Sequence, residues 1–262
     1  MYLLQEFFGA IESIGSYARF VWDVIVAAIM KPPKWALIRE QLFEVGLQSL
    51  PVVAMTGFST GLVLAAQAFF QLSDMGLVGT TGIMVGEAMI TELGPVLTAF
   101  MITGRVGASM CAELGTMYVT EQIDALQSMA VSPNRYLVAP RFIAATFMTP
   151  LLTIFSICMG IFGGYLITVY FFHMSPTTYF DPMPTHIHLF DLFMGFTKSV
   201  IFGIQIVTIS CFRGMTTRGG AAGVGRATTN SVVICYTAIL FSNFFITLGL
   251  NLVRSEISRW LT

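Results

Sequence analysis

Three charged residues interrupt long apolar stretches of this sequence, at Glu87, Glu92 and Lys198. A charge at the centre of a bilayer costs about 2.5 to 3.5 kcal/mol or more, so such residues usually face a cavity or a partner. Glu92 and Lys198 each lie about nine residues after an apolar stretch begins, which at about 1.5 Å per residue places them at a common depth. Either the two side chains pair and hold two helices together, or both line a central cavity, where Lys198 attracts a phosphate and Glu92 shapes the polar end.

Pro95 adds a backbone feature beside this pair. Proline has no N–H, so Pro95 cannot donate a hydrogen bond to the carbonyl of Thr91. We therefore expect the helix backbone to be open one residue from Glu92.

The composition places these residues in a membrane protein. The 262-residue chain is 55% apolar and 10% charged, and its mean hydropathy is +0.78. A soluble chain carries about 25% charged residues, so a soluble enzyme is excluded. Thirteen Lys and Arg against 14 Asp and Glu leave a net charge of −1, which excludes a nucleic-acid binder as well.

Continuous apolar stretches favour helices over a barrel, because backbone groups in lipid must be satisfied within each segment. The sequence therefore predicts an all-α polytopic bundle with five membrane-spanning helices, which puts the two termini on opposite sides. Three Gly-x-x-x-Gly pairs, at 57/61, 82/86 and 160/164, support close helix packing. The five stretches lie near 46–72, 83–105, 139–171, 189–212 and 231–253.

The positions of Lys and Arg predict the orientation. The connections 73–82 and 172–188 contain no Lys or Arg and should face away from the cytoplasm. Arg254 and Arg259 are the two exceptions to the pattern. The cytoplasmic face should carry Arg19, Lys31, Lys34, Arg39, Arg105, Arg135, Arg141, Arg213, Arg218 and Arg226.

The two ends of the chain are predicted to lie outside the bundle. Residues 1–40 should form an amphipathic helix in the membrane interface followed by a connector, and residues 254–262 a short non-cytoplasmic tail. An ordinary helix packed on the bundle is the alternative for the N-terminal segment, which the sequence Lys31-Pro-Pro-Lys34 should end. The apolar positions at helical spacing are Leu4, Phe7, Phe8, Ile11, Ile14, Val21, Trp22 and Ile25.

The connection at 105–141 is too polar to span a membrane and predicts a short cytoplasmic helix. Thr120 is expected to cap it and Pro133 to close it, with acidic residues in the first turn. Its apolar stripe, which needs a partner to cover it, consists of Ile123, Leu126 and Met129.

Four charged residues flank this helix and are expected to brace it rather than touch substrate: Arg105, Glu113, Arg135 and Arg141. Arg105 and Glu113 could pair only if their helix bends. A metal site at His186 and His188, near Asp181 and Asp191, is disfavoured, and no metal ligand is predicted. The four cysteines, at 111, 158, 211 and 235, are expected to be small core residues.

Five motifs follow one another in one uninterrupted order: Glu92-Leu-Gly-Pro-Val-Leu-Thr98, Gly104-Arg-Val-Gly-Ala108, Ala112-Glu-Leu-Gly-Thr-Met117, Val119-Thr-Glu-Gln-Ile-Asp-Ala-Leu126 and Pro140-Arg141. Together they resemble the MlaE permease family of ABC transporters. A second match, Gly219-Gly-Ala-Ala-Gly-Val-Gly-Arg-Ala-Thr-Thr229, is similar to the cytoplasmic connection before the last span in that family.

The resemblance implies a permease domain over residues 41–253 that works as a homodimer with a cytoplasmic ABC ATPase. It also implies a periplasmic MCE-domain partner, often a STAS-domain subunit, and phospholipid in a cavity between the two copies. The coupling helix, about 113–135, would dock into the ATPase through Glu121, Gln122, Ile123, Asp124, Ala125 and Leu126. Substrate-binding residues would be Glu92, Lys198, Val63, Leu64, Gln67, Phe70 and Leu93, with Pro95 in a structural role.

The sequence contains no nucleotide-binding motif of its own. The glycines of 219–225 follow no strand and precede no Lys, so this stretch is interpreted as a flexible connection. The chain is therefore expected to bind no cofactor, with ATP and Mg²⁺ on the partner ATPase. The alternatives are an ATP-independent channel or secondary transporter and, less favoured, an intramembrane enzyme. A bacterial inner membrane is expected, with the N-terminus cytoplasmic and the C-terminus periplasmic.

Overall fold

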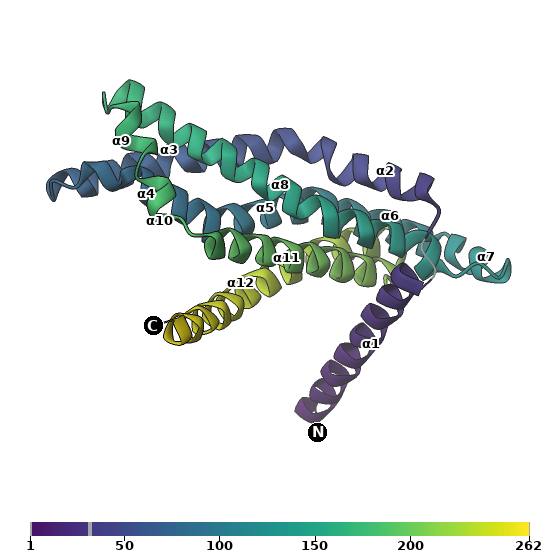
Figure 1. Ribbon diagram of the computed structural model, residues 1–262. Coiled ribbons are helices and arrows are strands. Elements are labelled where there is room, and N and C mark those ends of the chain that lie inside the picture. Colours follow the sequence, from purple (N-terminus) through teal and green to yellow (C-terminus); the bar gives the residue numbers. More distant parts are fainter. Residues whose placement is uncertain (1, 31–32, 262) are drawn as a thin grey trace.

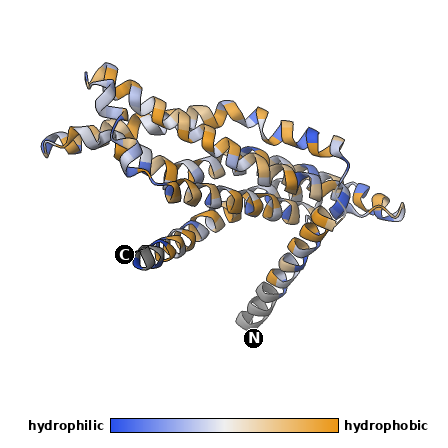
Figure 2. Ribbon diagram, in the orientation of Figure 1, coloured by the Kyte–Doolittle hydropathy of each residue, from blue (hydrophilic) through white to orange (hydrophobic). Residues whose placement is uncertain are grey.

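The computed structural model describes residues 2–30 and 33–261, which form helices and short connections and contain no strand (Figure 1). Apolar residues run along all the long helices (Figure 2). The all-α fold is as predicted. Its helices are α1 (Tyr2–Met30), α2 (Trp35–Val45), α3 (Leu50–Asp74), α4 (Thr81–Ala88), α5 (Gly94–Ile102), α6 (Ala108–Val119), α7 (Gln122–Ser128), α8 (Ala139–Leu166), α9 (Pro176–Phe180), α10 (Met183–His186), α11 (Leu189–Met215) and α12 (Gly220–Leu261).

Six helical segments of the described chain are long and apolar enough to cross a membrane. Five of them contain the five predicted stretches, and this confirms a polytopic helical bundle. The sixth, Glu12–Met30, belongs to α1, for which an interfacial position stays a prediction because length and composition suit either location.

Glycines bring α3 and α8 into backbone contact, as the Gly-x-x-x-Gly pairs predicted. A Cβ on Gly61 would overlap the backbone of Gly160, and one on Gly57 would lie 2.5 Å from the carbonyl oxygen of Ser156. A side chain at either position would push the two helices apart, so small residues are required along this seam.

The segment from Thr81 to Val119 is one continuous helical rod rather than a span that ends near residue 105. Two π-helical turns interrupt it, η3 (Met89–Leu93) between α4 and α5, and η4 (Thr103–Gly107) between α5 and α6. The rod carries the chain from the level of Glu92 to the start of α7, so it joins the two regions to which the sequence assigned function.

The connections 73–82 and 172–188, which contain no Lys or Arg, lie together at one end of the bundle, as the charge pattern predicted. Tyr179 on α9 is buried, its hydroxyl donates to the carbonyl of Ile161 at 3.2 Å, and its backbone lies against Gly82 of α4. Burial raises the pKa of the Tyr179 phenol above its ordinary value. At this end Arg254, one of the two exceptions in the charge pattern, pairs with the buried Asp191 at 3.0 Å.

The glycine-rich stretch after α11 is helical, and the expectation of a flexible connection is wrong. Gly219 and Gly220 turn the chain with positive φ angles of 94° and 66°, and α12 begins at Gly220. Inside the new helix, Gly223 lies against the carbonyl oxygen of Arg218, where a side chain would clash. These glycines therefore permit a tight turn, and the same helix continues through the predicted tail to Leu261.

The second half of α1 is attached to the bundle, while its first half diverges from it (Figure 1). Phe20, Val24 and Ala28 are buried, and the Tyr17 hydroxyl lies 2.7 Å from that of Thr208. Ile14 and Trp22 of the predicted apolar stripe are exposed, so they are free to face lipid. The side chains at 17, 20, 24 and 28 form the face that packs on the bundle, where α1 contacts α8 and α11. The predicted positions Leu4 to Ile11 and Lys31-Pro32 lie outside the residues whose side chains are described.

Candidate functional site

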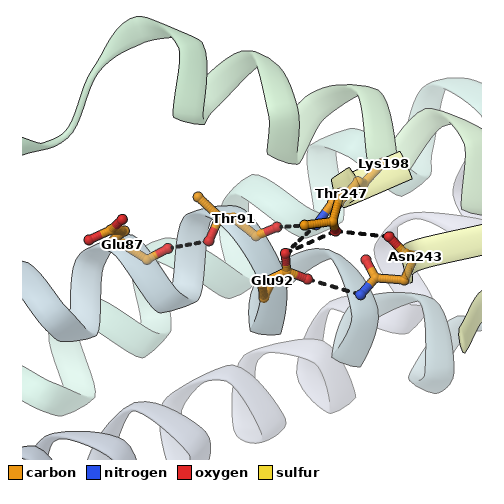
Figure 3. Close-up of polar contacts among 6 residues, drawn as sticks. All are labelled: Glu87, Thr91, Glu92, Lys198, Asn243 and Thr247. Carbon is orange, nitrogen blue, oxygen red and sulfur yellow. Dashed lines mark hydrogen bonds and ion pairs between the residues drawn. The ribbon is translucent and has the colours of Figure 1, made fainter. Parts of the chain in front are cut away.

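Glu92 and Lys198 form an ion pair, with 2.7 Å between Glu92 Oε1 and Lys198 Nζ (Figure 3). The Lys198 side chain is fully buried, whereas that of Glu92 keeps 37% of its surface exposed. Because a lone buried ammonium would be costly in an apolar bundle, the carboxylate stabilises it, and the pair ties η3 to α11. The predicted common depth of the two residues is confirmed.

The carbonyl left free by Pro95 is the second partner of Lys198. Lys198 Nζ donates to the Thr91 carbonyl oxygen at 2.8 Å. The π-helical turn Met89–Leu93 lies directly before the proline, and Gly195, one turn before Lys198, lets α11 approach the carbonyl of Ile90 closely. The open backbone and the glycine together bring the ammonium within reach of both acceptors.

Two residues of α12 complete the cluster and were not predicted. Asn243 Nδ2 donates to Glu92 Oε2 at 2.9 Å, and the Thr247 hydroxyl donates to Glu92 Oε1 at 3.0 Å (Figure 3). The two residues are four apart and so share one face of α12. The sequence feature that could have predicted these two residues is their four-residue spacing inside an apolar stretch. Glu92 therefore joins three segments, η3, α11 and α12.

Glu87 does not take part in this cluster. It is exposed on α4 and points away from Glu92 and Lys198 in Figure 3. The prediction that Glu87 faces a cavity or a partner, as Glu92 and Lys198 do, is wrong within a single chain. Glu87 lies five residues before Glu92, and this spacing turns its side chain to another side of the helix.

The other predicted substrate-binding residues are divided between two environments. Val63, Gln67 and Phe70 are exposed along one face of α3. Leu64 and Leu93 instead pack against Ala65, Val85 and Met89. Two cavities of about 750 and 920 Å³ open on the described residues, and neither is lined by these five residues. Within one chain they do not form a closed pocket.

The predicted coupling helix is shorter than 113–135 and begins differently. Residues 108–119 belong to α6, and α7 spans only Gln122–Ser128. The Thr120 hydroxyl donates back to the carbonyl of Thr116 at 2.8 Å, so it ends α6 and does not cap α7. Glu121 makes the turn between the two helices with a φ of 59°.

Only one residue of the apolar stripe of α7 is fully buried. Ile123 is buried and Leu126 partly buried, while Met129 is exposed. Glu121 and Asp124 are also exposed. This short helix therefore projects its acidic residues from the end of the bundle at which α6 ends and α2 begins (Figure 1).

The bracing residues act through partners other than those considered from the sequence. Arg141 pairs with Glu113 at 2.8 Å, which ties α8 to α6. Arg105 donates to the Glu44 carbonyl oxygen at 3.1 Å and to the Ser49 hydroxyl at 2.7 Å, and so joins η4 to the end of α2. Arg135 makes no ion pair with any described residue.

Asp191 has a structural role near the two histidines. Its Oδ2 accepts the backbone N–H of His188 at 2.9 Å at the start of α11, and its Oδ1 accepts Arg254. The described residues contain no cluster of three metal-binding side chains. Among the cysteines, Cys111, Cys211 and Cys235 are buried, but Cys158 is exposed, because it lies on the outer side of α8.

A bundle whose described residues include six helical segments long and apolar enough to cross a bilayer defines an integral, multi-pass membrane protein. The chain matches the family model described as Permease MlaE over residues 38–248 and therefore belongs to the MlaE permease family of ABC transporters.

Individual relatives cover most of the chain. It is 42% identical over 237 residues to a probable ABC transporter permease protein of Rickettsia typhi, with 90% of this chain and 91% of that protein covered. It is 34% identical to the intermembrane phospholipid transport system permease protein MlaE of Haemophilus influenzae, covering 80% and 81%. It is 33% identical to the chloroplastic protein trigalactosyldiacylglycerol 1 of Arabidopsis thaliana, covering 85% of this chain and 63% of that protein.

Proposed function

We propose that this chain is the permease subunit of an ABC transporter that moves phospholipid between the inner membrane and a periplasmic MCE-domain lipid carrier. The observation that carries the proposal is the half-exposed Glu92 carboxylate, held by Lys198, Asn243 and Thr247 on an otherwise apolar surface. The H. influenzae relative is named for intermembrane phospholipid transport, which supports the substrate class.

A second copy of the chain would enclose this surface. The exposed side chains Val63 and Phe70 on α3, and Phe241 and Phe244 on α12, supply apolar area for acyl chains and for a partner. A carboxylate left in contact with bulk lipid is unfavourable, so a closed and partly polar cavity between two copies suits Glu92 better. The partial exposure of Glu92 therefore supports the proposed homodimer.

A separate cytoplasmic ATPase would supply the energy. The acidic and exposed start of α7 lies at the end of the bundle that carries most of the Lys and Arg residues, which is the cytoplasmic end by the positive-inside rule. With α1 in the membrane interface, we infer a cytoplasmic N-terminus and a C-terminus in the periplasm of a bacterial inner membrane. ATP and Mg²⁺ would be bound by the ATPase, and a STAS-domain subunit is a further expected partner.

Purification of the tagged chain with its co-expressed partners tests the proposal. We expect an ATPase and an MCE-domain protein to co-purify, and ATP to accelerate phospholipid transfer between the reconstituted complex and the carrier. Phospholipid transfer by the purified chain without an ATPase subunit would instead favour an ATP-independent channel or secondary transporter.

A further inference from the structure

A second cavity, of about 920 Å³, lies at the end of the bundle opposite the connections 73–82 and 172–188. It is formed by the last turns of α1, the start of α2, the turn that follows α7 and the π-helical segment η5 (Asn134–Val138). These segments meet at this end of the bundle (Figure 1). No residue of η3, α11 or α12 lines it, so it is separate from the Glu92 cluster. Its walls are largely apolar and include Val26, Leu37 and Val131.

Two cations from distant parts of the sequence share this cavity, Lys34 and Arg135. Both are exposed, and neither forms an ion pair with any residue that the structure describes. Ser132 and Tyr136 add hydroxyl groups to the lining, and Asp23 is its one carboxylate. The cavity thus offers two unpaired positive charges and two hydroxyls beside an apolar wall, a combination that suits an anion with an apolar tail.

Exposed tryptophans indicate the level of this cavity in the membrane. Trp22 on α1 and Trp35 at the start of α2 are 67% and 71% exposed, and both lie within a few residues of the lining. Tryptophan is enriched at the boundary between headgroups and hydrocarbon. A lipid of the adjacent leaflet could therefore place its headgroup at Lys34 and Arg135 and a chain against Val26 and Leu37.

We propose that this cavity binds the headgroup of an anionic phospholipid of the cytoplasmic leaflet as a resident ligand, distinct from the transported lipid. Lys34 and Arg135 hold the phosphate, and Ser132 and Tyr136 donate hydrogen bonds to its oxygens. The proposal rests on the membrane orientation given under Proposed function. A soluble protein is disfavoured as the occupant because the two tryptophans place the opening at the lipid boundary.

Lipid binding to the purified complex in nanodiscs tests this site, with phosphatidylglycerol titrated against phosphatidylcholine. Each basic residue near an anionic bilayer contributes about fivefold in affinity. The double variant K34A/R135A should therefore lose about tenfold or more of the apparent affinity for phosphatidylglycerol, and less for phosphatidylcholine, because the choline cation offsets the charge of its phosphate. Asp23→Asn should raise the affinity for phosphatidylglycerol, because it removes the one competing carboxylate.

The matched control is R39A/R226A, which removes two exposed basic residues from the same end of the bundle but outside this cavity. An equal loss in the control would overturn the proposal, because general surface charge would then explain binding. Soluble glycerophosphate is a second competitor for the site. If it displaces phosphatidylglycerol as well as free lipid does, the cavity binds phosphate without using the acyl chain, and a lipid site is contradicted. The binding measurement needs no ATP turnover. A complex that fails to transport lipid would therefore count against the proposed function, but it would not affect the test of this binding site.

Discussion

At Glu92, one carboxylate accepts hydrogen bonds from Lys198, Asn243 and Thr247. The pairing with Lys198 could be predicted, because the two charges lie at equal depth in neighbouring apolar stretches. Pro95 predicted that the Thr91 carbonyl would lack its helical partner, but not that Lys198 would donate to it. Asn243 and Thr247 could not be assigned in advance, since polar residues on a long helix give no sign of which neighbour they face.

Lys198→Ala should lower ATP-driven phospholipid transfer by about tenfold or more while the protein still inserts and assembles. A hydrogen bond to a charged group contributes about 1.5 to 3 kcal/mol, and this change removes two hydrogen bonds and leaves Glu92 without its counter-charge. Transfer by the reconstituted complex is the measurement. Thr197→Ala, one residue away, is the control, because its hydroxyl bonds only within its own helix. Unchanged flux in K198A would rule out a role for this pair in transport.

The variants Asn243→Leu and Thr247→Val should each destabilise the protein by about 1 to 2 kcal/mol, because each removes a hydrogen bond to a carboxylate. Thermal unfolding in detergent, monitored by size-exclusion chromatography, measures the effect. Thr237→Val on the same helix is the comparison, since its hydroxyl is exposed and bonds only to the carbonyl of Val233. If all three variants unfold alike, α12 is not anchored through Glu92.

Among the elements, the apolar stretches predicted the positions of the five spans, but not the residues at which their helices end. Hydropathy marks the part of a helix that suits lipid, whereas α6 and the first turns of α12 continue the same helices with polar and small residues. The π-helical turns at 89–93 and 103–107 add one residue to a turn without any marked change in composition. They were therefore invisible in the sequence, although they position Glu92 and Arg105.

Gly61→Val should destabilise the bundle by about 1 to 3 kcal/mol, since its side chain would overlap the backbone of Gly160 and force α3 away from α8. The matched control is Gly249→Val on α12, where an added Cβ meets nothing within 4 Å. The yield of folded protein and its midpoint of thermal unfolding in detergent compare the two. Equal stability of both variants would contradict the close α3–α8 contact.

Across the whole molecule, the helical rod from Thr81 to Val119 connects the Glu92 cluster to the exposed helix α7. Arg105 joins this rod to the end of α2, and the pair of Glu113 with Arg141 joins it to α8. These contacts form a continuous packed connection between α7 and Glu92, which the proposed coupling to an ATPase requires.

The double variant E121A/D124A should lower both ATP turnover of the complex and phospholipid delivery by about tenfold or more, because it removes two exposed charges at the proposed ATPase contact. Steady-state ATPase and lipid-transfer assays on the same preparation measure the two rates. Gln127→Ala alters another exposed residue of α7 and should leave both rates unchanged. Wild-type rates in E121A/D124A would exclude this segment as the point of coupling.

A density map of the purified assembly tests the central proposal most directly. It should show two copies of this chain with lipid-shaped density enclosed between them, in contact with Glu92 and the exposed face of α3. A single copy, or two copies that meet elsewhere and leave Glu92 facing the surrounding bilayer, would contradict it.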